Sequence, residues 1–139
     1  MDLHTHKIIA WDLGKRMTAE LVVKTLNKAI SGTKSDWSDL TIQTDLGSQY
    51  TGAKFNQVLV KQAIKHSYSR KGTPYDNIMI EAFHAILKKE EVYHSTYKTH
   101  EEAQLAIFRY IEGFYNTRRI HSSLGYLTPN QAEKLALAA

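Results

Sequence analysis

Cysteine is absent from this chain of 139 residues, which excludes a disulfide framework, a thiolate zinc site and a cysteine nucleophile. No apolar run approaches the roughly 20 residues that cross a bilayer, and the first residues lack the pattern of a signal peptide. Repeats, low-complexity segments and linkers rich in proline, glycine or serine are also missing. We therefore expect a cytoplasmic protein with no membrane partner.

The composition that is present fits a single soluble domain over residues 1–139. The length is that of one domain, and a hydrophobic content of 42% is enough to build a core. Eighteen Lys and Arg against fourteen Asp and Glu give a net charge of +4. This charge permits a polyanionic partner without establishing one.

The first half of the chain predicts alternating strands and helices. Leu3 to Leu13 read as a half-buried strand, because Ile9, Trp11 and Leu13 fall on one side of an extended segment. Residues 18–30 read as a helix that ends near Gly32. A strand is expected over 40–44 and another over 64–69. The helix between them is predicted from the spacing of its apolar residues, which are Phe55, Val58, Leu59 and Ala63.

The second half predicts helices. Residues 77–92 form one, and Thr99 with Glu102 makes a capping box that opens a longer one. Thr128 before Pro129 begins a third, so residues 99–139 form a C-terminal helical part. The buried stripe of the long helix is expected to be Ile107, Ile111, Phe114 and Tyr115. The order of elements indicates an α/β fold, a mixed sheet layered with helices.

Two carboxylates stand out, each with an ordinary alternative. Asp45 follows the strand over 40–44, at the edge where α/β sheets bind ligands, although an aspartate before Gly47 is also typical of a turn. Glu81 shares a helical face with Asn77, His84 and Lys88, which could equally be a solvated polar face. Carboxylates on separate elements are the ligands that Mg²⁺ or Mn²⁺ requires, and two such ions can support an in-line displacement at phosphorus.

Three stretches carry a family resemblance: residues 44–51 (TDLGSQYT), residues 69–90 with the runs SRKG, YDN, EAF and LKKE, and residues 115–129 with YNTRRIHSSLG followed by Thr-Pro. In this order they closely resemble the second-aspartate motif, the glutamate motif and the C-terminal signature of bacterial insertion-sequence transposases with a retroviral-integrase-like core. The 35 residues between Asp45 and Glu81 match the separation that names the D,D-35-E group. Lys88 stands where that family has a basic residue.

The resemblance implies a ribonuclease-H-like mixed sheet with helices on both faces, and metal-dependent cleavage and joining of DNA. It implies that Asp45 and Glu81 are the second and third catalytic acids and ligands of Mg²⁺ or Mn²⁺, with two ions in the complete enzyme. Lys88 is implied as a DNA contact. The expected partners are DNA, as transposon ends and target, and further copies of the chain in a homo-oligomer, with no small-molecule substrate.

The family's first aspartate is expected on a strand upstream of the one that residues 1–13 match. Asp2 matches a non-catalytic aspartate of the family and Asp12 lies at the far end of that segment, so neither is assigned the role. The chain is thus expected to lack the first strand and the first catalytic acid, and to be inactive alone.

Further basic residues are candidate DNA contacts, each with an alternative. Arg70 and Lys71 could contact the DNA backbone or simply be solvated, as could Asn77 on the helical face of Glu81. Arg118, Arg119 and His121 end a helix, where cations are favourable for electrostatic reasons alone. A non-catalytic DNA-binding or self-associating transposase fragment is therefore the alternative to an enzyme core. An unrelated ribonuclease-H-like nuclease is disfavoured by the signature over 118–129.

Overall fold

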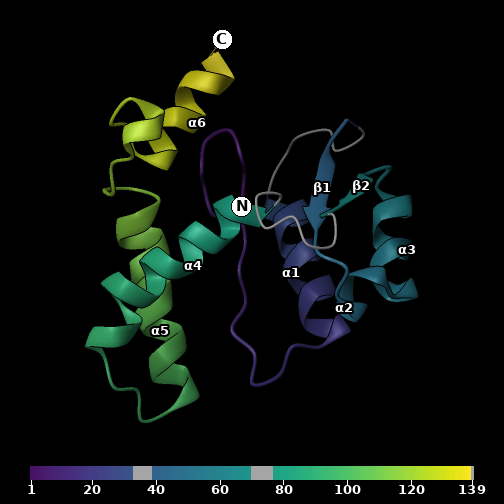
Figure 1. The fold of residues 1–139 in the computed structure, drawn as a ribbon, viewed down its shortest axis with the longest axis horizontal. Helices are drawn as coiled ribbons and strands as arrows, with labels where there is room; N and C mark the ends of the chain where they lie inside the picture. The colour runs from purple at the N-terminus through teal and green to yellow at the C-terminus, as the bar shows by residue number, and fades with distance from the viewer. Residues whose placement is uncertain (33–38, 70–76, 139) are drawn as a thin grey trace. The chain divides into compact units, whose positions relative to one another are not determined.

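The computed structural model describes residues 1–32, 39–69 and 77–138. The chain divides into two compact units (Figure 1). The α/β unit comprises Ala10–Ile78, and the helical unit comprises Met1–Ile9 together with Met79–Ala139. The helical part expected from residue 99 onward therefore belongs to a larger unit, while a single domain over 1–139 stays a prediction.

The α/β unit contains helices α1 (Ala19–Gly32), α2 (Ser48–Thr51) and α3 (Ala53–Lys61) and strands β1 (Thr41–Thr44) and β2 (Lys65–Tyr68). The two strands pair in parallel, with Thr41 opposite Lys65 and Thr44 opposite Tyr68. Both strands were expected, within one residue at each end. The described residues of this unit contain no further strand.

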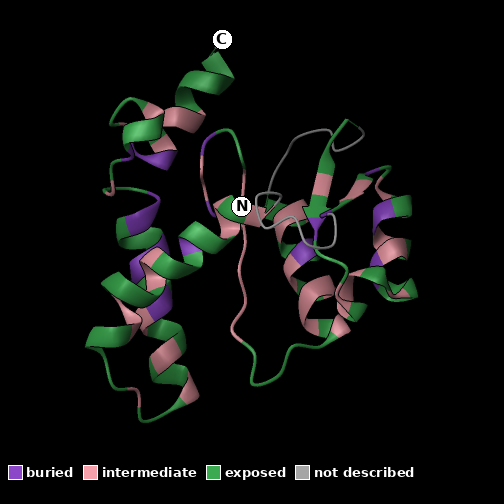
Figure 2. Cartoon of the chain, viewed as in Figure 1, coloured by how far each residue is buried: buried purple, intermediate pink, exposed green. Residues whose placement is uncertain are grey.

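A small apolar cluster holds this unit together. Leu26 of α1, Phe55 and Leu59 of α3, and Ile64 are buried (Figure 2), and Ile42 of β1 packs against them. The 3.6-residue period of the two helices and the two-residue period of the strand direct these side chains to one place. α3 ends at Lys61, and Ala63 follows with a left-handed φ of 54°. Ala63 was predicted on the apolar face of this helix but is exposed beyond its end.

The helical unit contains α4 (Ile78–Glu90), η2 (Val92–His94), α5 (His100–Tyr110), a π-helical turn η3 (Ile111–Tyr115), η4 (Ser122–Leu124) and α6 (Pro129–Ala138). Both predicted caps are confirmed. The Thr99 hydroxyl accepts from the Glu102 N–H, and Thr128 and Gln131 cap each other reciprocally. None of the described helices combines the length and the apolar content needed to cross a membrane.

The strand predicted over residues 3–13 is not formed, so this prediction was wrong. Thr5 and Ile8 are the buried residues of the segment, whereas Ile9, Trp11 and Leu13 are only half-buried. The backbone N–H of Ile8 donates to Asn116 Oδ1 over 3.0 Å, and its carbonyl accepts from Asn116 Nδ2 over 3.1 Å. A side-chain amide thus satisfies the backbone groups that a partner strand would satisfy, and no described strand pairs with residues 1–13.

Candidate active site

Asp45 follows β1 directly and is exposed. Its Oδ1 accepts from the backbone N–H of Gly47 over 2.8 Å, so the turn predicted from Gly47 is present. A Cβ at position 47 would lie 2.8 Å from the same oxygen, which explains why glycine suits the position. No described residue donates to the other carboxylate oxygen, Oδ2. The carboxylate is therefore oriented by the turn and still open to a ligand.

Thr44, the residue before Asp45, makes two polar contacts through its side-chain hydroxyl. Thr44 is 9% exposed, and its Oγ1 lies 3.0 Å from the carbonyl oxygen of Asp45 and 2.9 Å from Nε2 of His66. His66 lies on β2 and packs against the ring of Phe55. Burial lowers the pKa of His66 below its usual value, which favours a neutral ring. The resemblance gave no role to His66, and nothing in its local sequence marks it.

A second polar contact links β2 to the start of α4. Ser69 is buried and its hydroxyl donates to Asn77 Oδ1 over 2.7 Å. The amide of Gln43 donates to the same hydroxyl over 3.4 Å. Asn77, predicted as a DNA contact, is half-buried with its side-chain oxygen engaged in this network.

Glu81 is exposed in the first turn of α4. Partial burial lowers the pKa of His84, Lys88 lowers it further, and Glu81 opposes both. These couplings agree with the predicted shared face of the three residues. Among the described residues, neither Glu81 nor Lys88 has a hydrogen-bond or ion-pair partner through its side chain. Both are therefore available to a ligand.

The two predicted acids belong to different units, Asp45 to the α/β unit and Glu81 to the helical unit. Within the described part of either unit, no three His, Asp or Glu side chains form a group that could hold a metal ion. Exposed carboxylates are hard oxygen donors, so the chemistry of Asp45 and Glu81 fits Mg²⁺ or Mn²⁺. The metal assignment stays a prediction.

The predicted DNA contacts differ in their exposure and in whether their side chains already have partners within the protein. Arg70 and Lys71 lie outside the described residues, and Arg118 is exposed. Arg119 is bound to Glu90 through Nε at 3.0 and 3.1 Å and through Nη2 at 2.9 Å. His121 is 9% exposed, with its ring edge-on to Tyr115. Arg118 thus remains open to a ligand. Arg119 is ion-paired with Glu90, and His121 is buried against Tyr115.

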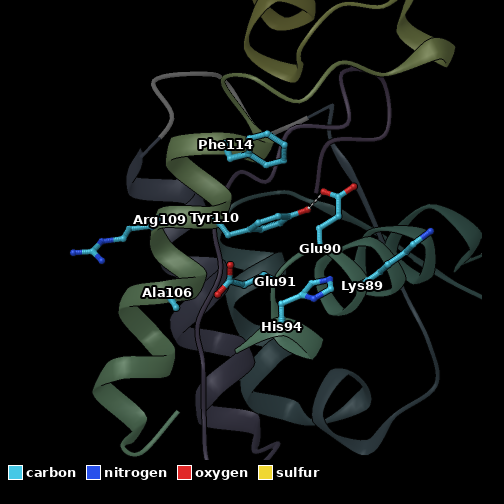
Figure 3. A pocket seen from close by; sticks show the side chains of 8 residues that line it. All are labelled: Lys89, Glu90, Glu91, His94, Ala106, Arg109, Tyr110 and Phe114. Carbon is cyan, nitrogen blue, oxygen red and sulfur yellow. Dashed lines mark hydrogen bonds between the residues drawn. The ribbon is translucent and has the colours of Figure 1, made fainter. Parts of the chain in front are cut away.

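Glu90 also accepts from the hydroxyl of Tyr110 over 2.7 Å, at a groove of about 730 Å³ between α4, η2 and α5 (Figure 3). Burial raises the pKa of Tyr110, and the neighbouring Glu90 raises it further. Burial raises the pKa of Glu90, but the hydrogen bonds from Arg119 and Tyr110 lower it by more. The carboxylate therefore stays charged. The sequence placed Glu90 in the LKKE run but gave no sign of this role, because its partners are 20 and 29 residues away.

Comparisons with known proteins identify the family of the chain. The Integrase core domain family matches residues 1–74, more than half of the chain, and a second Integrase core domain family matches residues 62–129. The transposase for insertion sequence element IS904 of Lactococcus lactis is 40% identical over 96% of this chain and 53% of its own length. The transposase InsF for insertion sequence IS3fB of Escherichia coli is 36% identical over 99% of this chain and 48% of its own. The chain thus spans about half the length of these curated relatives.

The fold has a counterpart among solved structures. A chain of a simian T-cell lymphotropic virus intasome, determined by electron cryomicroscopy with PP2A regulatory subunit B56 gamma, has a TM-score of 0.66 to this chain at 20% identity. The match covers 86% of this chain and 41% of that one. It confirms the predicted ribonuclease-H-like α/β fold. On the family matches and the fold together, the chain belongs to the integrase core domain family.

Proposed function

We propose that this chain is part of the catalytic core of an insertion-sequence transposase, which cuts and joins DNA by metal-dependent polynucleotidyl transfer. The observation that carries the proposal is the pair of exposed carboxylates Asp45 and Glu81, separated by 35 residues in a chain similar to named transposases. A homo-oligomer acting on transposon ends and target DNA is part of the same proposal.

Integrase and transposase cores generally depend on a divalent metal ion. Asp45 and Glu81 would hold it here, and the ion would supply charge stabilisation at a phosphate undergoing displacement. The turn at Gly47 orients the Asp45 carboxylate before any ligand binds. Lys88, seven residues after Glu81 on α4, supplies positive charge for a phosphate near that acid.

Binding of Mn²⁺ tests the catalytic assignment. The wild-type chain should bind Mn²⁺ weakly, and Asp45→Asn or Glu81→Gln should each weaken it at least tenfold, because each removes a charged oxygen ligand. Electron paramagnetic resonance of free Mn²⁺ measures the affinity. Glu101→Gln, at an exposed position in the first turn of α5, is the matched control and should have no effect. Equal affinity in all four proteins would contradict the metal site.

DNA binding tests the partner. Lys88 and Arg118 should contact phosphates, so Lys88→Gln with Arg118→Gln should lower the slope of log affinity against log salt by about 2. Titration of a labelled duplex at several salt concentrations measures this slope. Lys134→Gln, exposed on α6, is the control. Binding that does not depend on salt, or an equal effect of the control, would count against this surface.

The alternative is a DNA-binding fragment without catalysis. The two tests separate the candidates. Salt-dependent DNA binding without Mn²⁺ binding by Asp45 and Glu81 is the result expected of the alternative.

A further inference from the structure

The Thr44 hydroxyl lies between the backbone of Asp45 and the ring of His66. Its Oγ1 is 3.0 Å from the Asp45 carbonyl oxygen and 2.9 Å from His66 Nε2. His66 reaches this position because it pairs with Ile42 in the parallel register, two residues before Thr44 on β1. Thr44 is buried, which limits the access of water to its hydroxyl.

The number of protons in this network limits how it can be arranged. A carbonyl oxygen only accepts, so the contact with Asp45 requires Thr44 to donate its single hydroxyl proton there. The Thr44 oxygen must then accept from His66, which requires a hydrogen on Nε2. The contacts seen in the structure therefore select the Nε2–H form of the ring.

The opposite side of the ring favours the other tautomer. His66 Nδ1 lies 3.4 Å from Asn56 Oδ1. The amide nitrogen of Asn56 donates to the carbonyls of Thr51 and Gly52, which fixes Oδ1 as the atom that faces the ring. A hydrogen on Nδ1 would satisfy Asn56. Nε2 of a neutral ring would then accept the hydrogen bond of the Thr44 hydroxyl, which could no longer donate to the Asp45 carbonyl. The tautomer of His66 thus decides whether Thr44 holds Asp45.

We propose that His66 is a positioning residue for Asp45, acting through the Thr44 hydroxyl. In its Nε2–H form it directs that hydroxyl onto the Asp45 carbonyl and fixes the peptide that leads into the Gly47 turn. The turn in turn fixes Asp45 Oδ1, leaving Oδ2 for a metal ion. The inference rests on the proposed function, because that function makes Asp45 a metal ligand.

Matched variants separate this role from general packing. His66→Gln keeps an N–H donor about as far along the side chain as Nε2, whereas His66→Asn offers one only near the position of Nδ1. Thr44→Ser keeps the hydroxyl and Thr44→Val removes it at nearly constant volume. The positioning role predicts that Gln and Ser behave like the wild type and that Asn and Val do not.

Two measurements in the metal-free chain test the proposal directly. The ¹⁵N shifts of the His66 ring should report a hydrogen on Nε2, and a hydrogen on Nδ1 alone would overturn the proposal. Hydrogen exchange of the Gly47 amide should accelerate about fivefold in His66→Asn and Thr44→Val, because its bond to Asp45 loosens. It should be unchanged in His66→Gln and Thr44→Ser. Equal exchange within each pair would also overturn the proposal.

Mn²⁺ affinity then links the positioning role to the site. His66→Asn and Thr44→Val should weaken binding about tenfold, as loss of a group that orients a metal ligand typically does. If Asp45→Asn leaves the Mn²⁺ affinity unchanged, the proposed function fails. The exchange rates of the Gly47 amide still test the role of His66 in that case. If Asp45→Asn abolishes binding and both members of each pair bind alike, only the role of His66 fails. Circular dichroism of each variant shows whether it is folded, and equal unfolding of both members of a pair counts against the proposal.

Discussion

The side chain of Asn116 makes the pair of backbone hydrogen bonds that a neighbouring β-strand would make with the N-terminal segment. It is 1% exposed, and its two hydrogen bonds satisfy both backbone groups of Ile8. Its own carbonyl accepts from the N–H of Asn130, at the start of α6. One residue therefore joins three segments of the helical unit.

Replacing Asn116 with alanine should lower the free energy of unfolding by about 3 kcal/mol, because it leaves a buried N–H and a buried carbonyl of Ile8 without partners. Urea denaturation followed by circular dichroism measures the change. Asn27→Ala, at an exposed position of α1, is the control and should change stability by less than about 0.5 kcal/mol. A loss of less than about 1 kcal/mol in Asn116→Ala would show that water replaces the amide.

Single residues were predictable from the sequence where their partners are close in the chain. The turn at Asp45 follows from Gly47 two residues on, and the cap at Thr99 follows from Glu102 three residues on. The partner of Asn116 is 108 residues away, so its local pattern shows only a polar residue after a helix. The family resemblance selected Asp45 and Glu81. It could not identify Thr44 and His66, whose hydrogen bonds lead to the backbone carbonyl of Asp45.

The long helix of the second half changes its hydrogen-bond register near its end. The N–H of Asn116 donates to the carbonyl of Ile111 over 2.9 Å, five residues back, as in a π-turn. This inserts one residue into the helical repeat and brings Tyr115 and Asn116 inward together. Phe114, predicted in the buried stripe, is 41% exposed, whereas Tyr110 is buried. A fixed 3.6-residue period cannot anticipate such a shift.

The predicted strand over residues 3–13 failed for a related reason. Alternation of apolar residues shows that a segment can lie half-buried in a sheet, but a strand also needs backbone partners on a neighbouring segment. β1 and β2 supply each other with these partners. The helices were predicted well because an α-helix forms its hydrogen bonds within its own segment.

Gly113, within the π-turn, and Gly125, which follows η4, should respond to alanine in opposite directions. A Cβ at either Gly113 or Gly125 would meet no atom within 4 Å, so crowding plays no part. Gly113→Ala should stabilise the chain by about 0.5 kcal/mol, because alanine restricts the unfolded chain. Gly125 has a φ of 64°, so Gly125→Ala should destabilise it by about 1 kcal/mol. Thermal denaturation measures both, and a shift of the same sign would contradict the assigned backbone conformations.

Histidines make the stability of the whole chain depend on pH. Burial lowers the pKa values of four of them, in both units: His6, His66, His84 and His121. A lowered pKa means that the unfolded chain binds protons more readily than the folded chain. Their contribution is therefore complete above the usual histidine pKa of about 6.5 and is lost as pH falls through the folded pKa values.

Two carboxylates add a second loss at lower pH. Burial raises the pKa of Asp12, but hydrogen bonds from Lys28, Lys24 and Thr25 outweigh it, so the pKa is lowered. The pKa of Glu90 is lowered in the same way by Arg119 and Tyr110. Their stabilisation is present above their usual pKa of about 4 and disappears as pH falls below it. Acid should thus destabilise the chain in two steps, histidines first.

His121 offers a test of the first step, because its neighbours in the helical unit are known. Besides burial, Arg119 and His6 lower its pKa while Glu90 raises it, and its ring lies 5.2 Å from that of Tyr115.

His121→Phe keeps an aromatic ring against Tyr115 but cannot bind a proton. The free energy of unfolding of the wild type should fall between about pH 8 and pH 5, and the variant should lose stability less steeply. Urea titrations across this range measure the slope, with His94→Gln at an exposed position of η2 as the control. If the slope of His121→Phe equals that of the wild type, protonation of His121 does not oppose folding, and the acid response comes from other titratable groups such as His6, His66 and His84.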